Sequence, residues 1–182
     1  IREHGIKHLA VYAFSTENWN REPAEVSYLM SLFRELIHKE MKELGKEGVR
    51  IRFAGQRERF LPDLQKAIDT TEEETAKNDA ITVWVCLSYG GRAEIIVAAQ
   101  AIAASKEEMS EESFKKHLWT QEMPDPDLII RTGGEKRLSN FLTWQSVYSE
   151  LFFIATFWPD FSRKDFDAVL SEFALRERRH GK

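Results

Sequence analysis

Short apolar runs recur along the chain and are separated by stretches in which apolar residues have helical spacing. A strand that is buried on both faces carries a near-continuous apolar sequence, and the clearest example here is Ile81–Leu87. The apolar runs predict five strands, at residues 7–14, 49–54, 81–87, 128–131 and 151–155.

Helical spacing is clearest after Pro23, where Val26, Met30, Phe33 and Ile37 fall at i, i+4, i+7 and i+11. This stripe predicts an amphipathic helix that ends near Gly45 or Gly48. The polar stretch 15–22 predicts a loop. Further helices are predicted at residues 62–78, 93–104, 110–118, 140–149 and 162–174, the last with a capping box between Ser162 and Asp165.

The alternation of strands and helices predicts an α/β fold with a mainly parallel central sheet flanked by helices. We expect a single domain over residues 1–182, because 182 residues with 42% hydrophobic composition suffice for one core. The net charge of −4 argues against nucleic-acid binding, so any anion site is a local cluster of donors. No signal sequence or membrane-length apolar run occurs, which predicts a cytoplasmic protein.

The most informative segment follows the predicted strand at 128–131. Gly133 and Gly134 let the backbone turn sharply, and Arg131, Arg137 and Ser139 flank that turn. Guanidinium groups bind phosphate oxygens in pairs, and free backbone N–H groups of the turn would add donors. The segment therefore predicts a cradle for a phosphate or diphosphate.

Other polar segments follow the first and third predicted strands, at 15–21 and 88–92. In open parallel sheets ligands bind beyond the carboxyl ends of the strands. Convergence of these loops would assemble four arginines with two acids, and Mg²⁺ between a carboxylate and phosphate oxygens would explain that mixture. The residues concerned are Arg21, Arg92, Arg131, Arg137, Glu17 and Glu150.

Each of these residues has a simpler interpretation. A lone arginine such as Arg92 is commonly solvated, and Glu150 is also suited to an ion pair with an arginine. Trp19 fits packing better than base stacking, and the stripe after Pro23 fits either a core or the wall of an apolar groove. Cys86 lies in an apolar run and is interpreted as a small buried hydrophobe, and no Cys/His spacing typical of a zinc site occurs.

Two stretches together, Tyr12–Arg21 and Asp127–Leu142, resemble the signatures of the cis-prenyltransferases, and the nearest type is bacterial undecaprenyl diphosphate synthase. The match continues through five further segments, so it covers essentially the whole chain in order. Those segments are 89–92, 144–145, 148–151, 157–161 and 176–179.

The resemblance implies a Mg²⁺-dependent transferase that adds isopentenyl diphosphate to an allylic diphosphate of the farnesyl type. Each addition would create a Z double bond and lengthen a polyprenyl diphosphate such as undecaprenyl diphosphate, a cell-wall lipid carrier. The family is typically homodimeric, and we expect membrane association only transiently, through the product.

Site residues follow from the resemblance position by position. Asn18 lies where the family places a residue that assists proton removal, and Glu150 matches a metal ligand. Four residues would bind the isopentenyl diphosphate group, namely Arg131, Arg137, Leu138 and Ser139. Five would line the substrate site, namely Ser15, Thr16, Glu17, Trp19 and Arg21. The helix from Pro23 to Gly45 would form part of a tunnel for the growing chain.

Three departures from the family pattern qualify this interpretation. The family's opening strand, with its Asp-Gly-Asn-Gly-Arg-Trp motif and metal-binding Asp, does not occur in residues 1–182, and Ile1–Gly5 resembles the last turn of a helix. We therefore expect this chain by itself to bind isopentenyl diphosphate without turnover. Lys136 stands where many members have His, and Ser88 where Asn is common.

Two alternatives remain open on the sequence. The first is a non-catalytic subunit that keeps the anion site and supports a partner. The second is a phosphate-binding α/β module with no prenyl specificity.

Overall fold

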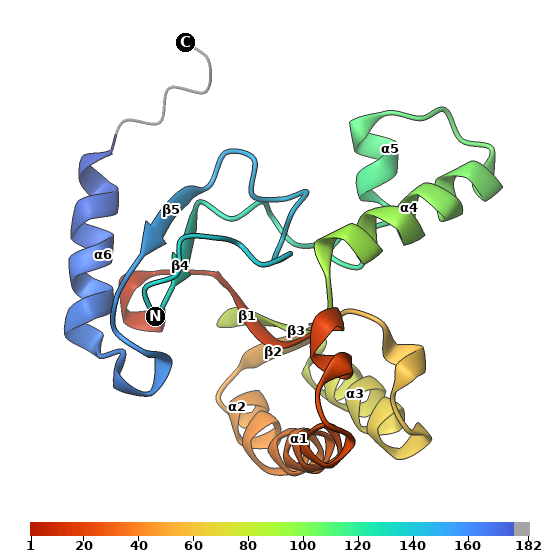
Figure 1. The fold of residues 1–182 in the computed structure, drawn as a ribbon, viewed down its shortest axis with the longest axis horizontal. Helices are drawn as coiled ribbons and strands as arrows, with labels where there is room; N and C mark the ends of the chain where they lie inside the picture. Colours follow the sequence, from red (N-terminus) through yellow and green to blue (C-terminus); the bar gives the residue numbers. More distant parts are fainter. Residues whose placement is uncertain (177–182) are drawn as a thin grey trace. The chain divides into compact units, whose positions relative to one another are not determined.

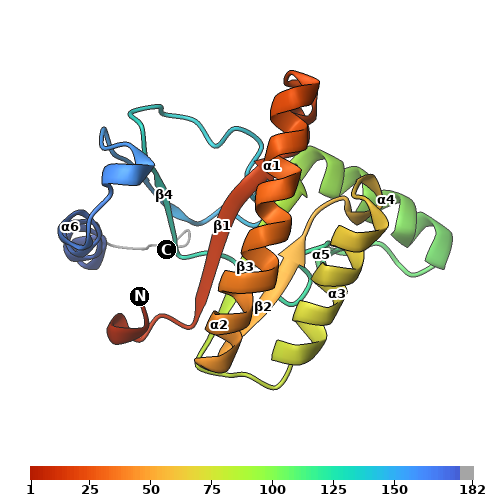
Figure 2. The ribbon, with the colours of Figure 1, turned by 90° about the horizontal axis from the view of Figure 1, so that it is seen from below.

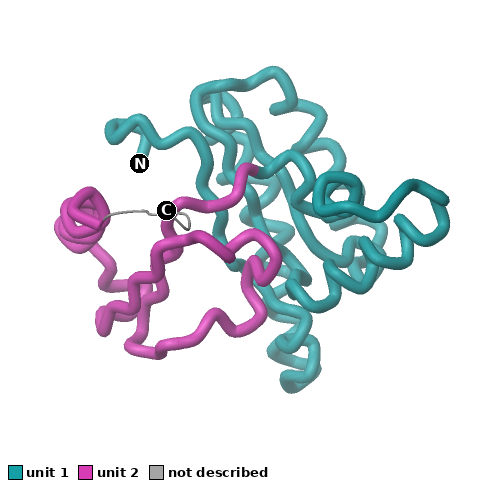
Figure 3. The backbone as a smooth tube through the Cα atoms, turned by 90° about the horizontal axis from the view of Figure 1, so that it is seen from above, with its two compact units in different colours: residues 1–123 teal, residues 124–182 magenta. Residues whose placement is uncertain are grey.

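The structure, a computed structural model, describes residues 1–176, and the chain divides into two compact units, residues 1–123 and 124–182 (Figures 1 and 3). Each unit is built on its own parallel sheet with helices beside it. The predicted fold class, α/β with parallel strands flanked by helices, is confirmed, although the strands form two sheets. The single domain over residues 1–182 stays a prediction.

The sheet of the first unit has the order β1-β3-β2, with β1 at His8–Ser15, β2 at Val49–Ala54 and β3 at Ile81–Tyr89. The middle strand β3 pairs in parallel with both neighbours. Its residues are buried on both faces, as its apolar sequence predicts. Cys86 has no exposed surface, and burial raises the pKa of its thiol, which confirms the interpretation of a buried hydrophobe.

A long helix and α3 lie along one face of this sheet (Figure 2). The long helix is continuous through α1, a π-helical turn η3 and α2, and it ends at Lys46, as the apolar stripe predicts. Ile37 from η3 and Leu64 and Ile68 from α3 complete the core against Ile51 of β2. The helical elements of this unit are η1 Arg2–His4, η2 Thr16–Asn20, α1 Pro23–Leu36, η3 Ile37–Met41, α2 Lys42–Lys46, η4 Arg57–Arg59, α3 Pro62–Thr75, α4 Gly91–Ser105 and α5 Glu111–Lys115.

The second unit carries β4, β5, η5 and α6. The two strands pair in parallel, from Leu128 opposite Glu150 to Arg131 opposite Phe153. The capping box that opens α6 is confirmed, since the Ser162 hydroxyl accepts the Asp165 N–H and the Asp165 carboxylate accepts the Ser162 N–H. The elements are β4 Leu128–Arg131, β5 Glu150–Phe153, η5 Trp158–Asp160 and α6 Arg163–Leu175.

The predicted helix at residues 140–149 is wrong. This stretch forms successive turns, with a single helix-like bond from the Ser146 N–H to the Leu142 carbonyl at 3.0 Å. Asn140 and Leu142 have φ angles of 66° and 44°. Left-handed residues break the regular ladder of a right-handed helix, so apolar spacing alone misidentified the segment.

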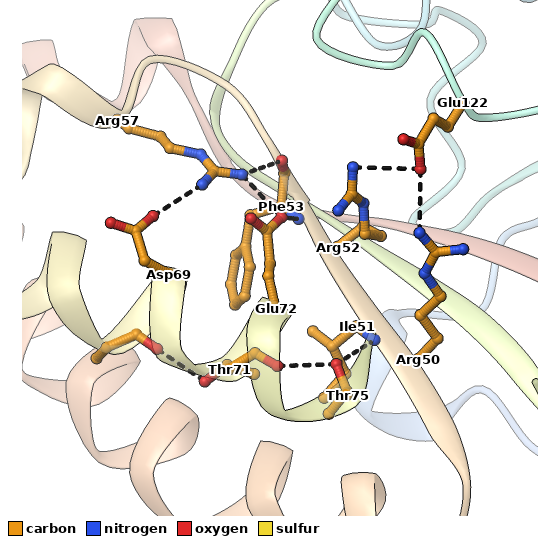
Figure 4. Close-up of polar contacts among 11 residues, drawn as sticks. Arg50, Ile51, Arg52, Phe53, Arg57, Asp69, Thr71, Glu72, Thr75 and Glu122 are labelled. Carbon is orange, nitrogen blue, oxygen red and sulfur yellow. Dashed lines mark hydrogen bonds and ion pairs between the residues drawn. The ribbon is translucent and has the colours of Figure 1, made fainter. Parts of the chain in front are cut away.

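The outer edge of β2 is covered by side chains of α3 (Figure 4). The Thr75 hydroxyl accepts the Ile51 N–H at 3.0 Å and donates to the Thr71 carbonyl at 2.8 Å. The Glu72 carboxylate accepts the Phe53 N–H at 2.7 Å and is held by Arg57 at 2.7 Å. These bonds satisfy backbone donors that would otherwise offer the sheet edge to another strand.

Replacing Thr75 by Val tests this edge cover. The variant keeps the shape of the side chain but leaves the buried Ile51 N–H without an acceptor, so we expect a loss of about 1–3 kcal/mol in the free energy of unfolding. Thr71→Val is the matched control, because the Thr71 hydroxyl bonds only the Ala67 carbonyl of its own helix. Urea unfolding followed by circular dichroism measures both, and equal losses would contradict the role given to Thr75.

Candidate functional site

The polar stretch after β1 is a short 3₁₀ helix, η2, and not the irregular loop expected from the sequence. Ser15 and Asn18 close it reciprocally. The Ser15 hydroxyl accepts the Asn18 N–H at 3.2 Å, and the Asn18 side-chain oxygen accepts the Ser15 N–H at 2.8 Å. The pair is a capping box, in which a hydroxyl and a side chain three residues later satisfy each other's backbone donors.

This bond decides what Asn18 offers to a ligand. Its side-chain oxygen accepts the Ser15 N–H, and its NH₂ group supplies two donors that can contact a substrate. An amide NH₂ donates hydrogen bonds and does not accept protons. The geometry therefore suits Asn18 to holding a phosphate oxygen, and not to acting as a base.

Trp19 makes both a hydrogen bond and packing contacts. Its indole N–H donates to the Ser88 hydroxyl at 2.8 Å, and its ring meets Phe14 edge-on with centroids 5.2 Å apart. The guanidinium of Arg59 lies over the indole, 4.5 Å from the centroid. Sequence reasoning missed Arg59, because a single arginine in a charged turn carries no signal of its own.

The other predicted lining residues of this loop lie toward solvent. The Thr16 hydroxyl donates to the Glu17 carboxylate at 3.1 Å. Arg21 pairs with Glu25 at 2.5 Å one helical turn later, and both side chains are about half exposed. Arg21 is thus available to an anion that displaces Glu25, at little cost because exposed ion pairs are weak.

A buried carboxylate fixes the turn after β3. Glu94 in the first turn of α4 is 1% exposed and accepts the Tyr89 hydroxyl at 2.5 Å. It also accepts the Thr120 N–H at 3.0 Å and the Thr120 hydroxyl at 2.8 Å. Burial and the nearby Glu94 raise the pKa of Tyr89, so the phenol stays protonated and keeps donating. This network anchors the Gly90–Gly91 turn that precedes Arg92, and no sequence pattern predicted it.

A hollow of about 590 Å³ in the first unit lies between η3–α2 and α3. Ile37, Met41 and Ala67 contribute apolar surface to it, and three lysines also line it, namely Lys42, Lys46 and Lys66. The predicted role of the long helix as a tunnel wall stays a prediction.

In the second unit, the segment after β4 is tied together by Arg131. Its Nη1 donates to the Arg137 carbonyl and to the Ser139 hydroxyl, each at 2.7 Å. Arg131 and Ser139 are therefore brought together as the sequence suggested. The Arg137 guanidinium pairs with Glu135, and Ser139 has a φ of 50°, an uncommon angle that the side-chain bond supports.

The glycine amides do not serve as the expected free donors. The Gly133 N–H donates to the Thr156 carbonyl at 2.9 Å and the Gly134 N–H to the Ile154 carbonyl at 2.8 Å. Both glycines have left-handed φ angles, 87° and 78°, and continue the pairing of β4 with the chain after β5. These two glycine amides are therefore not available to an anion, and the phosphate cradle formed by the rest of the segment stays a prediction.

Glu150 lies at the other end of the strand pair. It pairs with Leu128, whereas Arg131 pairs with Phe153, three residues or about 10 Å further along and on the opposite face. Its carboxylate accepts from Arg176 Nη1 at 2.8 Å. Strand register thus separates Glu150 from Arg131, and the ion-pair alternative describes the contact that is seen. The convergence of Glu150 with the arginines of the cradle stays a prediction.

Arg176 is held from three sides. Besides Glu150, it pairs with Glu172 at 2.7 Å, and its guanidinium lies 3.8 Å from the centroid of the Phe152 ring. The hydrogen bonds to Glu150 and Glu172 raise the pKa of Arg176. The Glu150 carboxylate, a predicted metal ligand, is therefore paired with the Arg176 guanidinium in this structure.

Within residues 1–176, no three His, Cys, Asp or Glu side chains are grouped so that they could hold a metal ion. Mg²⁺ commonly uses one or two carboxylates together with substrate phosphate oxygens, and Glu150 fits that pattern if it exchanges Arg176 for the ion. Over the same residues, no helix combines the length and hydrophobicity needed to cross a bilayer.

The profile of a family described as putative undecaprenyl diphosphate synthase matches residues 1–181. The chain belongs to this family of prenyltransferases. It is 46% identical to an isoprenyl transferase of Thermotoga maritima, over 98% of this chain and 79% of that protein. It is also 46% identical to a decaprenyl diphosphate synthase of Mycolicibacterium smegmatis, over 99% of this chain and 64% of the other.

Solved structures of the family agree with this membership. A probable undecaprenyl diphosphate synthase from Campylobacter jejuni is 37% identical with a TM-score of 0.92, covering 100% of this chain and 86% of its own. Lavandulyl diphosphate synthase from Lavandula x intermedia, in complex with dimethylallyl diphosphate, is 34% identical with a TM-score of 0.94, covering 100% and 81%. The predicted family and enzyme class, a prenyl-transferring enzyme, are confirmed.

The role of Asn18 as a cap is testable by stability. Asn18→Ala removes the acceptor of the Ser15 N–H and is expected to lower the free energy of unfolding by about 1 kcal/mol. Asn18→Asp keeps an acceptor, so its stability should stay close to that of the unmodified protein. Asn20→Ala, an exposed residue of the same loop, is the control. Denaturant unfolding measures the stability of all three variants. Equal losses in the free energy of unfolding for Asn18→Ala and Asn20→Ala would rule out the cap.

Proposed function

We propose that this prenyltransferase condenses isopentenyl diphosphate with an allylic diphosphate of the farnesyl type. Repeated Z-type additions lengthen a polyprenyl diphosphate, with undecaprenyl diphosphate as the representative product. The observation that carries the proposal is the segment after β4, in which Arg131 is held against Ser139 beside Arg137, in a chain that matches the family throughout.

The isopentenyl diphosphate group is assigned to the segment from Arg131 to Ser139. Arg131 uses Nη1 for the two bonds that shape the segment, so its other N–H groups remain for phosphate oxygens. Arg137 exchanges Glu135 for the diphosphate, and Ser139 and the backbone around Leu138 complete the contact. Charge-assisted bonds from two arginines orient the substrate without a basic surface elsewhere.

The second group of residues is the loop after β1. Ser15, Thr16, Glu17, Trp19 and Arg21 line the substrate site in this proposal. The allylic substrate loses its diphosphate as its C1 forms a bond with the terminal alkene carbon of isopentenyl diphosphate. The proton at C2 of the isopentenyl unit then leaves to a phosphate oxygen or water, and the Asn18 NH₂ orients that acceptor.

The proposal includes Mg²⁺ held by the Glu150 carboxylate together with diphosphate oxygens. Bound there, the ion would neutralise charge that develops on the leaving diphosphate. Arg176 neutralises Glu150 when no metal is present. A homodimeric state, a cytoplasmic location and transient membrane contact through the product complete the proposal, and they rest on family resemblance.

Substitution of the two arginines tests the substrate assignment. Arg131→Ala and Arg137→Ala should each weaken binding of isopentenyl diphosphate about 10- to 100-fold, because each removes charged hydrogen bonds. Arg163→Ala in α6 is the matched control and should not change affinity. Isothermal titration measures all three. An equal effect on inorganic phosphate would favour the phosphate-binding module.

Turnover tests the reaction itself. The full-length protein, incubated with labelled isopentenyl diphosphate, farnesyl diphosphate and Mg²⁺, should form longer prenyl diphosphates, and EDTA should stop their formation. Normal binding of isopentenyl diphosphate without chain growth would instead support the non-catalytic subunit.

A further inference from the structure

Ser88 is an inserted residue in the pairing of β3 with β1. Phe14 pairs with Leu87 and Ser15 pairs with Tyr89, so Ser88 lies between two paired residues and has no partner of its own. A residue of this kind is a β-bulge, and bulges commonly redirect a side chain next to a functional site. The opposite shift between Tyr12 and Phe14 restores the register, so the bulge is confined to the end of the strand.

The backbone of Ser88 is in an uncommon conformation. Its φ is 52° and the residue is fully buried. Residues other than glycine rarely adopt such angles, and they persist only where surrounding contacts enforce them. Glycine would adopt this φ without strain, so the serine side chain indicates that its hydroxyl has a use.

Two bonds show what this conformation achieves. The Ser88 hydroxyl accepts the Trp19 indole N–H at 2.8 Å, and the Ser88 carbonyl accepts the Gln56 N–H at 3.1 Å. The close packing there also requires Gly55, since a Cβ at that position would lie 2.0 Å from the Leu87 carbonyl oxygen. One residue at the end of β3 thereby ties down the segments that follow β1 and β2.

Different residues contact the ring of Trp19 and its indole N–H. Phe14, Phe60 and Arg59 contact the ring, and Ser88 holds the N–H. The ring contacts alone would permit the indole to rotate in its plane, because aromatic and cation–π contacts are tolerant of such rotation. The hydroxyl bond is directional and sets the orientation.

We propose that Ser88 is a positioning residue: by accepting the Trp19 N–H from a β-bulge, it holds the Ser15–Arg21 loop in the shape that receives substrate. The hydroxyl does not touch substrate and acts only through Trp19. The expected effect on kcat/KM rests on the proposed function, whereas the hydrogen bond between Trp19 and Ser88 does not.

Three substitutions separate the hydroxyl from the backbone. Ser88→Gly relieves the left-handed strain and removes the acceptor, so it should fold at least as stably and still lose about tenfold in kcat/KM. Ser88→Ala should lose the same factor and also stability. Ser88→Asn tolerates the left-handed region and carries a side-chain acceptor, and it should restore most of the activity.

A structural readout works without turnover. In ¹⁵N spectra of the full chain, the Trp19 indole N–H resonance, assigned with Trp19→Phe, should shift in Ser88→Gly and Ser88→Ala and return toward its original position in Ser88→Asn. The double variant of Ser88→Gly with Trp19→Phe should be no slower than Trp19→Phe alone, within about twofold, because the same bond is removed in each.

Two controls match the substitutions. Lys106→Gly relieves a left-handed residue of φ 61° at the exposed end of α4, and Ser171→Ala removes a hydroxyl bonded only within α6. Neither should change kcat/KM or the Trp19 resonance.

An unshifted indole resonance in Ser88→Gly would overturn the proposal, as would a double variant much slower than Trp19→Phe. If the unmodified full-length protein of the turnover assay shows no prenyl transfer, the proposed function fails, and the indole resonance still decides whether Ser88 positions Trp19.

Discussion

The position of β3 between β1 and β2 is the constraint on which the first unit depends. Parallel pairing on both sides makes the three strands end at one edge, and it buries both faces of β3. The polar segments that follow the strands thereby come together at that edge. Trp19 after β1 and Gln56 after β2 both bond Ser88 near the end of β3. The geometry of the loop containing Asn18 therefore follows from strand order as much as from the loop's own sequence.

The loops of both units are closed by their own side chains. Ser15 and Asn18 satisfy each other after β1, and Arg131 bridges to Ser139 after β4. Loops that are already ordered lose less entropy when a ligand binds, which favours tight and oriented contact. This organisation accounts for uncommon backbone angles at Ser88 and Ser139, since each is held by a bond from a neighbouring side chain.

Several of the charges assigned to substrate or metal are paired within the protein. Arg21 pairs with Glu25, Arg137 with Glu135, and Glu150 with Arg176. Such pairs at partly exposed positions are weak, so the diphosphate and metal ion of the proposed function would displace them at little cost.

The sequence alone determined the elements and the family. Periodicity identified all five strands and the long helix from Pro23, and two dense motifs indicated the prenyltransferases, because these signals are local in the chain. Tertiary structure decided the rest. Left-handed residues make 140–149 a series of turns instead of a helix. Strand register separates Glu150 from Arg131, and a β-bulge directs the Ser88 side chain to Trp19. The register and the bulge depend on pairing between residues distant in sequence, and no local pattern encodes the register of such pairs.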